Sequence, residues 1–243
     1  MSFSWTRVEA IFRKELRDYR RNRFVIFTMS ALPLLFIVLT MIQLFAINTG
    51  SSAKLNDRIG ISMLYLLIIP TMVPSALTAY SVVGEREQGT LEAVLITPVR
   101  SEEFLVGKAL AAFTPTVLIA YALFGLFLGA AELFAHPGVL SAIFERSHVL
   151  VQLLFTPLLA GWSIWMGIAI SARSTDVRAA QQLAVFASLP PLGVVALLSF
   201  DVIPASVALA LGLAAALLVL DGFGWRAVAA IFDRERLITG SRD

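Results

Sequence analysis

The chain contains no cysteine among its 243 residues. Disulfides, thiolate metal sites and a cysteine nucleophile are therefore excluded. It also has only two histidines, His136 and His148, and no HExxH pattern. Neither histidine lies inside a long apolar run, and no spacing of ligand-type residues around them matches a known metal motif. The sequence therefore disfavours a metal site and an intramembrane protease.

Charge is also scarce. Only 15% of the residues are charged, whereas soluble domains carry about 25%. The formal net charge of +2 gives no basic surface of the kind that binds nucleic acid. Hydrophobic residues make up 58% of the chain. This composition leaves too little polar surface to cover a soluble domain, so lipid is the expected solvent.

Long apolar runs account for most of the chain. A spanning helix needs about 20 mostly apolar residues, and six segments meet this requirement. They cover about 24–46, 59–83, 105–131, 149–172, 180–200 and 203–222. The outer connections are too short to fold alone, so we expect an all-α polytopic membrane protein with a single transmembrane domain over 1–243. The cramped connection at 199–204 fits either a tight hairpin or a re-entrant piece.

The basic residues fix the expected orientation. Sixteen of the 19 Lys and Arg residues fall on one side of the six predicted spans. Basic residues favour the cytoplasmic side. We therefore expect both termini in the cytoplasm, with 223–243 as a cytoplasmic tail, and a location in the cytoplasmic membrane.

Residues 1–23 form an amphipathic pattern. On a helical wheel one arc gathers the apolar residues Trp5, Val8, Phe12, Leu16 and Tyr19. The facing arc gathers the basic residues Arg7, Arg13, Lys14, Arg17, Arg20 and Arg21. This pattern predicts an interfacial helix with its apolar face in lipid, anchored by Trp5, Phe12, Arg13, Lys14 and Arg17. The alternatives are a basic flank that only sets topology, and a surface that packs against a cytoplasmic partner.

The stretch 84–108, GEREQGTLEAVLITPVRSEEFLVGK, separates the second and third runs. Gly84 is expected to end the second span, and Thr90 to cap a short polar helix that stops at Thr97-Pro98. Ser101 is expected to cap the helix of the third span. A loop that only connects two spans does not need such a helix, so the stretch is typical of a lever for a cytoplasmic partner. Glu85 and Glu87 are also candidate ion-pair partners of the inner-loop residues Arg173 and Arg178.

The chain lacks the phosphate-binding pattern GxxxxGK[ST]. Its only Gly-Lys pair, Gly107-Lys108, is followed by alanine and lies at the mouth of a span, where Lys108 is expected to snorkel to the interface. We therefore expect no ATP binding, no enzymatic activity and no bound cofactor. Acidic residues are placed near span ends, with Asp221 near the inner end of the sixth, which disfavours an ion-coupled carrier. The abundant aromatic residues suit a hydrophobic cargo or lipid equally, so the substrate-binding residues stay unknown.

Several motifs follow one another in a specific order. They are Glu85-Arg86-Glu87, Gly89-Thr90-Leu91-Glu92, Thr97-Pro98-Val99 and Gly107-Lys108, with FRKELRD at 12–18, an inner loop at 171–182 and FDRERL at 232–237. This order resembles the ABC type-2 exporter permeases over essentially the whole chain. The resemblance implies an N-terminal elbow helix and a coupling helix at 84–97 that fits a groove on a nucleotide-binding subunit. The implied coupling residues are Glu85, Arg86, Glu87, Gly89, Thr90, Leu91 and Glu92.

The same resemblance implies the partners. The chain would be a half-permease of the bacterial inner membrane. It would pair with a second copy or a close paralogue and with two separate ATPase subunits, which hold ATP and Mg²⁺. The expected function is efflux of a small hydrophobic or amphiphilic substrate, such as a drug or antibiotic. The alternatives are a non-transporting scaffold or sensor, and an exporter of lipid, glycan or ion.

Overall fold

The computed structural model describes residues 3–45, 52–87, 89, 99–135, 139–145, 148–200 and 206–231. Within these ranges the chain is helical and contains no strand. The helices are α1 (Trp5–Arg21), α2 (Arg23–Phe45), α3 (Ser52–Glu87), α5 (Ser101–Phe134), α6 (Val139–Glu145), α7 (His148–Arg173), α8 (Val177–Ser199) and α9 (Val207–Ile231). The expected all-α class is confirmed.

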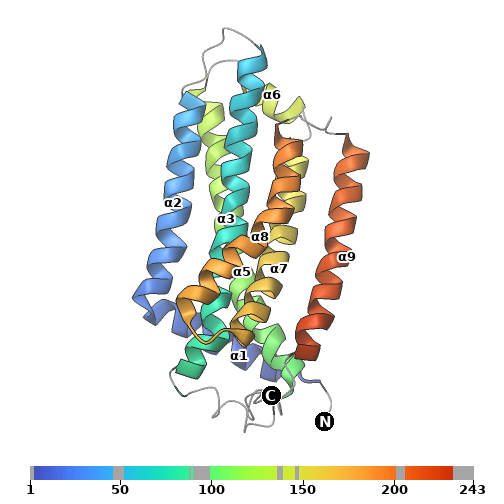
Figure 1. The fold of residues 1–243 in the computed structure, drawn as a ribbon. Coiled ribbons are helices and arrows are strands. Elements are labelled where there is room, and N and C mark those ends of the chain that lie inside the picture. Colours follow the sequence, from blue (N-terminus) through green and yellow to red (C-terminus); the bar gives the residue numbers. More distant parts are fainter. Residues whose placement is uncertain are drawn as a thin grey trace.

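Six of these helices are long and apolar enough to cross a membrane: α2, α3, α5, α7, α8 and α9. They stand side by side as an upright bundle (Figure 1), and the prediction of six spans is confirmed. The expected bounds were too short for α3 and α5, which contain 36 and 34 residues. At 1.5 Å per residue both extend to about 50 Å, longer than the ~30 Å hydrocarbon core. We therefore expect their ends to extend beyond the hydrocarbon core.

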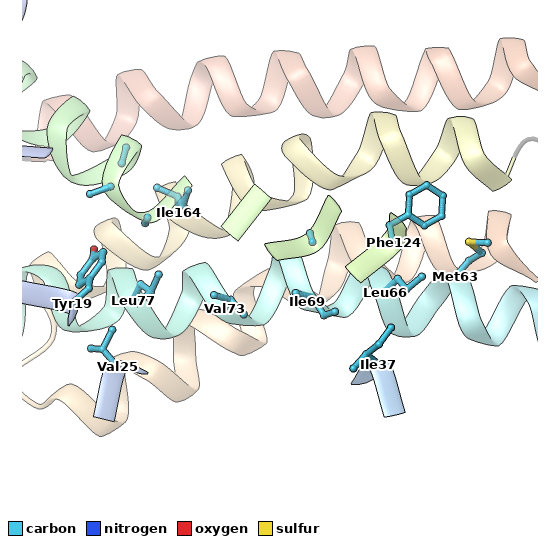
Figure 2. Packing of buried hydrophobic residues seen from close by; sticks show 14 of the residues in the cluster. Tyr19, Val25, Ile37, Met63, Leu66, Ile69, Val73, Leu77, Phe124 and Ile164 are labelled. Carbon is cyan, nitrogen blue, oxygen red and sulfur yellow. The ribbon is translucent and has the colours of Figure 1, made fainter. Parts of the chain in front are cut away.

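Helix α3 is the centre of the bundle and packs against α2, α5, α7 and α8. Its apolar side chains Met63, Leu66, Ile69, Val73 and Leu77 are almost fully buried and line up along the helix (Figure 2). A helix that is apolar on all sides is placed either among other helices or in lipid, and α3 is surrounded by other helices. By contrast, α9 packs mainly on α7 and stands at the edge of the bundle (Figure 1).

Helix α1 lies across one end of the bundle, which we call the α1 end (Figure 1). It packs on α5 and is joined to α2 through the single residue Asn22. The predicted amphipathic helix is present, but most of its apolar face packs against the bundle rather than entering lipid. Val8 and Tyr19 are buried, and Phe12 packs partly against the core. Trp5 alone of that face is largely exposed, at 69%.

Glycine at position 107 explains this close packing. A Cβ placed there would lie 2.7 Å from the Cβ of Ile11, which is closer than real side chains approach. Gly107 therefore lets α1 lie directly against α5. The basic anchors predicted on the other face, Arg13 and Arg17, are exposed.

Two expected helix ends were wrong. Gly84 does not end α3, which continues to Glu87. A helical glycine costs only about 1 kcal/mol, and the contacts of the last turns with α7 outweigh that cost. Ser101 is the first residue of α5 rather than its cap; Arg100 holds the cap position, and its N–H donates to the Glu103 carboxylate at 3.0 Å. The connection at 199–204, for which a tight hairpin and a re-entrant piece were both open, falls largely on residues outside the described ranges.

Candidate functional site: a buried charge cluster where three helices meet

Four charged side chains meet where α1, α3 and α5 come together at the α1 end. Helix α1 contributes Lys14 and Glu15, α3 contributes Glu85, and α5 contributes Lys108. We call these four residues the charge cluster. It contains two positive and two negative groups, so it carries no net charge when all four are ionised.

Lys108 is the hub of the charge cluster. Its side chain is only 1% exposed. The Nζ donates to Glu15 Oε1 at 2.8 Å and to the backbone carbonyl of Ser81 at 2.9 Å, and lies 3.1 Å from Glu85 Oε1. It also lies 4.8 Å from the centroid of the Phe104 ring. One ammonium group therefore joins three helices, and the prediction that Lys108 snorkels to the interface was wrong. The side chain turns inward because two carboxylates and a carbonyl offer it partners there.

Lys14 closes the cluster on its more open side. Its Nζ donates to Glu85 Oε1 at 2.5 Å and to Glu15 Oε1 at 3.2 Å, and the side chain is 44% exposed. Burial alone would lower the pKa of Lys14, but Glu15 and Glu85 outweigh it and raise that pKa above its usual value. Burial alone would raise the pKa of Glu15, but Lys108 and Lys14 outweigh it and hold that pKa below its usual value. Both α1 groups therefore stay ionised at neutral pH.

A second ion pair ties the beginnings of α1 and α5 together. The fully buried Glu103 carboxylate accepts from Arg7 Nη2 at 2.7 Å and from the Ser4 N–H at 2.8 Å. It also accepts the Arg100 N–H described above. Charge-assisted hydrogen bonds of this kind are the stronger class. Helix α1 is therefore fastened to α5 at two places along its length.

The end of α3 is also fastened to α7. Arg86 donates to the backbone carbonyls of Ala172 and Ser174, at 3.1 and 3.2 Å, at the C-terminal end of α7. A cation is favoured at that negative end of the helix dipole. About one turn earlier in α3, a second contact is made with α7. Ser171 Oγ of α7 donates to the Ala79 carbonyl at 2.7 Å and accepts hydrogen bonds from the N–H groups of Val82 and Val83.

Close approach makes the α3–α7 contact possible. A Cβ at Gly167 would lie 1.9 Å from Thr78 Oγ1, so only glycine fits at that position. The last three turns of α3 therefore share hydrogen bonds with α7 and ion pairs with α1 and α5. In consequence, the end of α3 cannot shift without disturbing all three neighbours.

Four of the seven predicted coupling residues lie within the described part of the chain, and three lie outside it. Glu85 faces the charge cluster, Arg86 binds the end of α7, and Glu87 is exposed. Gly89 forms a turn with φ of +67°, a conformation open to glycine, and its N–H donates to the Arg86 carbonyl at 3.1 Å. Thr90, Leu91 and Glu92, with most of the predicted helix at 84–97, lie outside the described residues.

The pairing considered for Glu85 was wrong. It is bound by Lys14 and Lys108 rather than by Arg173 or Arg178. Sequence reasoning missed Glu15 and Lys108 as site residues. One signal was available: Glu15 falls on the apolar side of the α1 wheel, between the directions of Ile11 and Val8. A carboxylate on a buried face requires a buried cation.

The charge cluster consists of paired, mostly buried charges. Among the described residues no group of three or more His, Asp and Glu side chains is arranged to hold a metal ion. What it provides is a rigid link from the end of α3 to α1 and α5. The molecule is thus a multi-pass membrane protein whose polar stretch between two spans is linked firmly to the bundle.

The comparison with protein families agrees with this architecture. Residues 6–194 match the family described as ABC-2 type transporter. The chain therefore belongs to this family and is a permease component of an ABC transporter, which implies an ATPase partner. A search among curated proteins gives no match. The match ends within α8, so α9 lies outside it.

Proposed function

We propose that the chain is the membrane subunit of an ATP-driven exporter. It pairs with a second copy or a close paralogue and with two ATPase subunits, and it neither binds nor hydrolyses ATP itself. Both termini and the α1 end face the cytoplasm, α1 is the elbow helix, and residues 84–97 are the contact with the ATPase. The exported substrate is small and hydrophobic or amphiphilic.

The linkage of the end of α3 is the observation that supports this proposal. Glu85 and Arg86 belong to the stretch 84–97, and they bind α1, α5 and α7 through the contacts described above. A displacement of this stretch therefore reaches four helices at once. A connecting loop has no need of such links, whereas force transmission from an ATPase requires them.

The test uses the complex of the chain with its ATPase subunit in lipid nanodiscs. We expect Glu92→Arg to assemble but to lower permease-dependent ATP turnover at least about tenfold, which corresponds to roughly 1.4 kcal/mol of barrier. The matched control is Glu132→Arg, which reverses an exposed carboxylate at the opposite end of α5 and should leave turnover unchanged. If Glu92→Arg assembles and turns over ATP normally, residues 84–97 are not the coupling contact, and the scaffold or sensor function is favoured instead.

A further inference from the structure

A cavity of about 510 Å³ lies between α5, α7 and α9. One wall of the cavity is the face of α5 that carries Leu110 and Phe113, whereas Lys108 on the same helix points into the charge cluster. A cavity of this volume is large enough for a drug-sized ligand. Leu110 and Leu218 lie at its wall and are themselves 37% and 61% exposed, so the cavity opens toward the surface of the bundle that lipid covers.

Among the described residues, Asp221 of α9 is the only charged side chain that lines this cavity. Its Oδ1 is buried and has no hydrogen-bond partner among the described residues. Its Oδ2 lies against α7 at Gly161, where a Cβ would be only 3.0 Å away. Glycine at 161 therefore makes room for the carboxylate. An unpaired carboxylate among apolar groups is costly, and ionisable groups in membrane segments usually mark functional sites. A cation in the cavity would offset that cost.

Aromatic rings line the same cavity. Trp165 and Trp225 meet edge to face, with ring centroids 4.6 Å apart, and Phe113 contributes a third ring. Aromatic faces attract alkylammonium groups, especially where water is excluded. The cavity thus combines one carboxylate, three rings and an otherwise apolar wall that opens to lipid. These features match one ligand chemistry: a single cationic head joined to an apolar tail.

We propose that this cavity binds an amphiphile with one ammonium head group, taken up from the surrounding bilayer. The head lies between Asp221 and the two tryptophan rings, and the tail lies along Leu110 and Leu218. Asp221 and Trp225 come after residue 194, so the family match does not include them. The inference rests on the cavity alone and holds whether or not the chain exports anything.

The test is a binding measurement on the full chain in phosphatidylcholine nanodiscs. Two of the four tryptophans line the cavity, so a brominated ligand bound there quenches the intrinsic fluorescence. The probes are 11-bromoundecyl-trimethylammonium, 11-bromoundecanol and 11-bromoundecyl sulfate, compared at equal mole fraction in the bilayer. We expect the cation to quench at about tenfold lower mole fraction than the alcohol, and the anion to be the weakest.

Variants then locate the site. Asp221→Asn should abolish the preference for the cation, Asp221→Glu should retain most of it, and Trp225→Leu should reduce it. Asp57→Asn, which removes an exposed carboxylate outside the cavity, is the matched control and should bind like wild type. Thermal melting checks that each variant is folded; if Asp221→Asn is not, Asp221→Glu and Trp225→Leu decide the question.

Two results would overturn the proposal. Equal quenching by the cation and the alcohol in wild type means that the cavity is a plain apolar or lipid site. An undiminished cation preference in folded Asp221→Asn, or in folded Trp225→Leu, places the cation elsewhere. No ATPase takes part in this measurement, so its outcome is separate from that of the turnover test.

Discussion

Glu15 and Asp221 are both carboxylates in apolar surroundings of one bundle, but they differ in whether the fold provides them with a cation. Glu15 is held by Lys108 from α5 and Lys14 from its own helix. Asp221 faces a cavity, and its Oδ1 has no partner in the described part of the chain. A group that serves as a structural link must find its counter-charge within the fold. A carboxylate that has no counter-charge within the fold is free to bind a cationic ligand.

Removing the hub should produce the largest effect. Lys108→Met removes the buried cation of the charge cluster and leaves Glu15 and Glu85 with only the partly exposed Lys14 as a partner, so we expect a loss of about 3–5 kcal/mol in the free energy of unfolding. Lys14→Met is the matched control, because it removes the other lysine of the charge cluster at a site that is 44% exposed. It should cost about 1 kcal/mol or less.

Unfolding of the purified chain in detergent, followed by tryptophan fluorescence, measures both variants. The description of Lys108 as the hub would be contradicted if the two lysine variants lost equal stability. It would also be contradicted if Lys108→Met unfolded like wild type.

Acid should weaken the charge cluster through Glu15. The pKa of Glu15 is lowered from its ordinary value of 4.5, because Lys108 and Lys14 outweigh the effect of burial. A lowered folded-state pKa contributes stability that is present above pH 4.5 and is lost as the pH falls through the folded value. Wild type should therefore lose more stability between pH 6 and pH 3 than Glu15→Gln does. Melting curves of both across that range test this; parallel losses would remove Glu15 as the cause.

The smallest effect should have the opposite sign. In the absence of ligand, Asp221→Asn removes an unsatisfied carboxylate, so we expect no loss of stability and a gain of up to about 1 kcal/mol. Glu103→Gln is the contrasting variant, because that carboxylate accepts from Arg7, Ser4 and Arg100 and should lose stability when neutralised. A clear destabilisation by Asp221→Asn would show that Asp221 has a structural partner.

Much of the fold could be predicted from the sequence because its signals are local. Six apolar runs and one amphipathic segment are each readable without knowing their neighbours, and so is the motif order at 84–108. The exact end of α3 could not be predicted, because Gly84 is a weak helix breaker. Its cost in helix stability is outweighed by contacts with α7. Those contacts depend on Ser171, a residue almost ninety positions away.

The charge cluster could not be predicted for the same reason. Lys108 and Glu15 are separated by 93 positions, and the sequence around each residue does not indicate that the other is its partner. Asp221 was placed near the inner end of its span, which says nothing about the glycine on α7 that accommodates it. Only the position of Glu15 on the apolar side of the α1 wheel was a usable sign that a buried cation was required.

The double fastening of α1 to α5 has a consequence for biosynthesis. Glu15 leaves the ribosome 93 residues before Lys108 does. At 5–20 residues per second, that interval lasts roughly 5–20 s. During this time two transmembrane segments are made while the surface of α5 on which α1 packs does not yet exist. The first helix to be synthesised is therefore among the later ones to reach its final place, and a nascent chain halted before residue 108 should leave α1 open to proteases or chaperones.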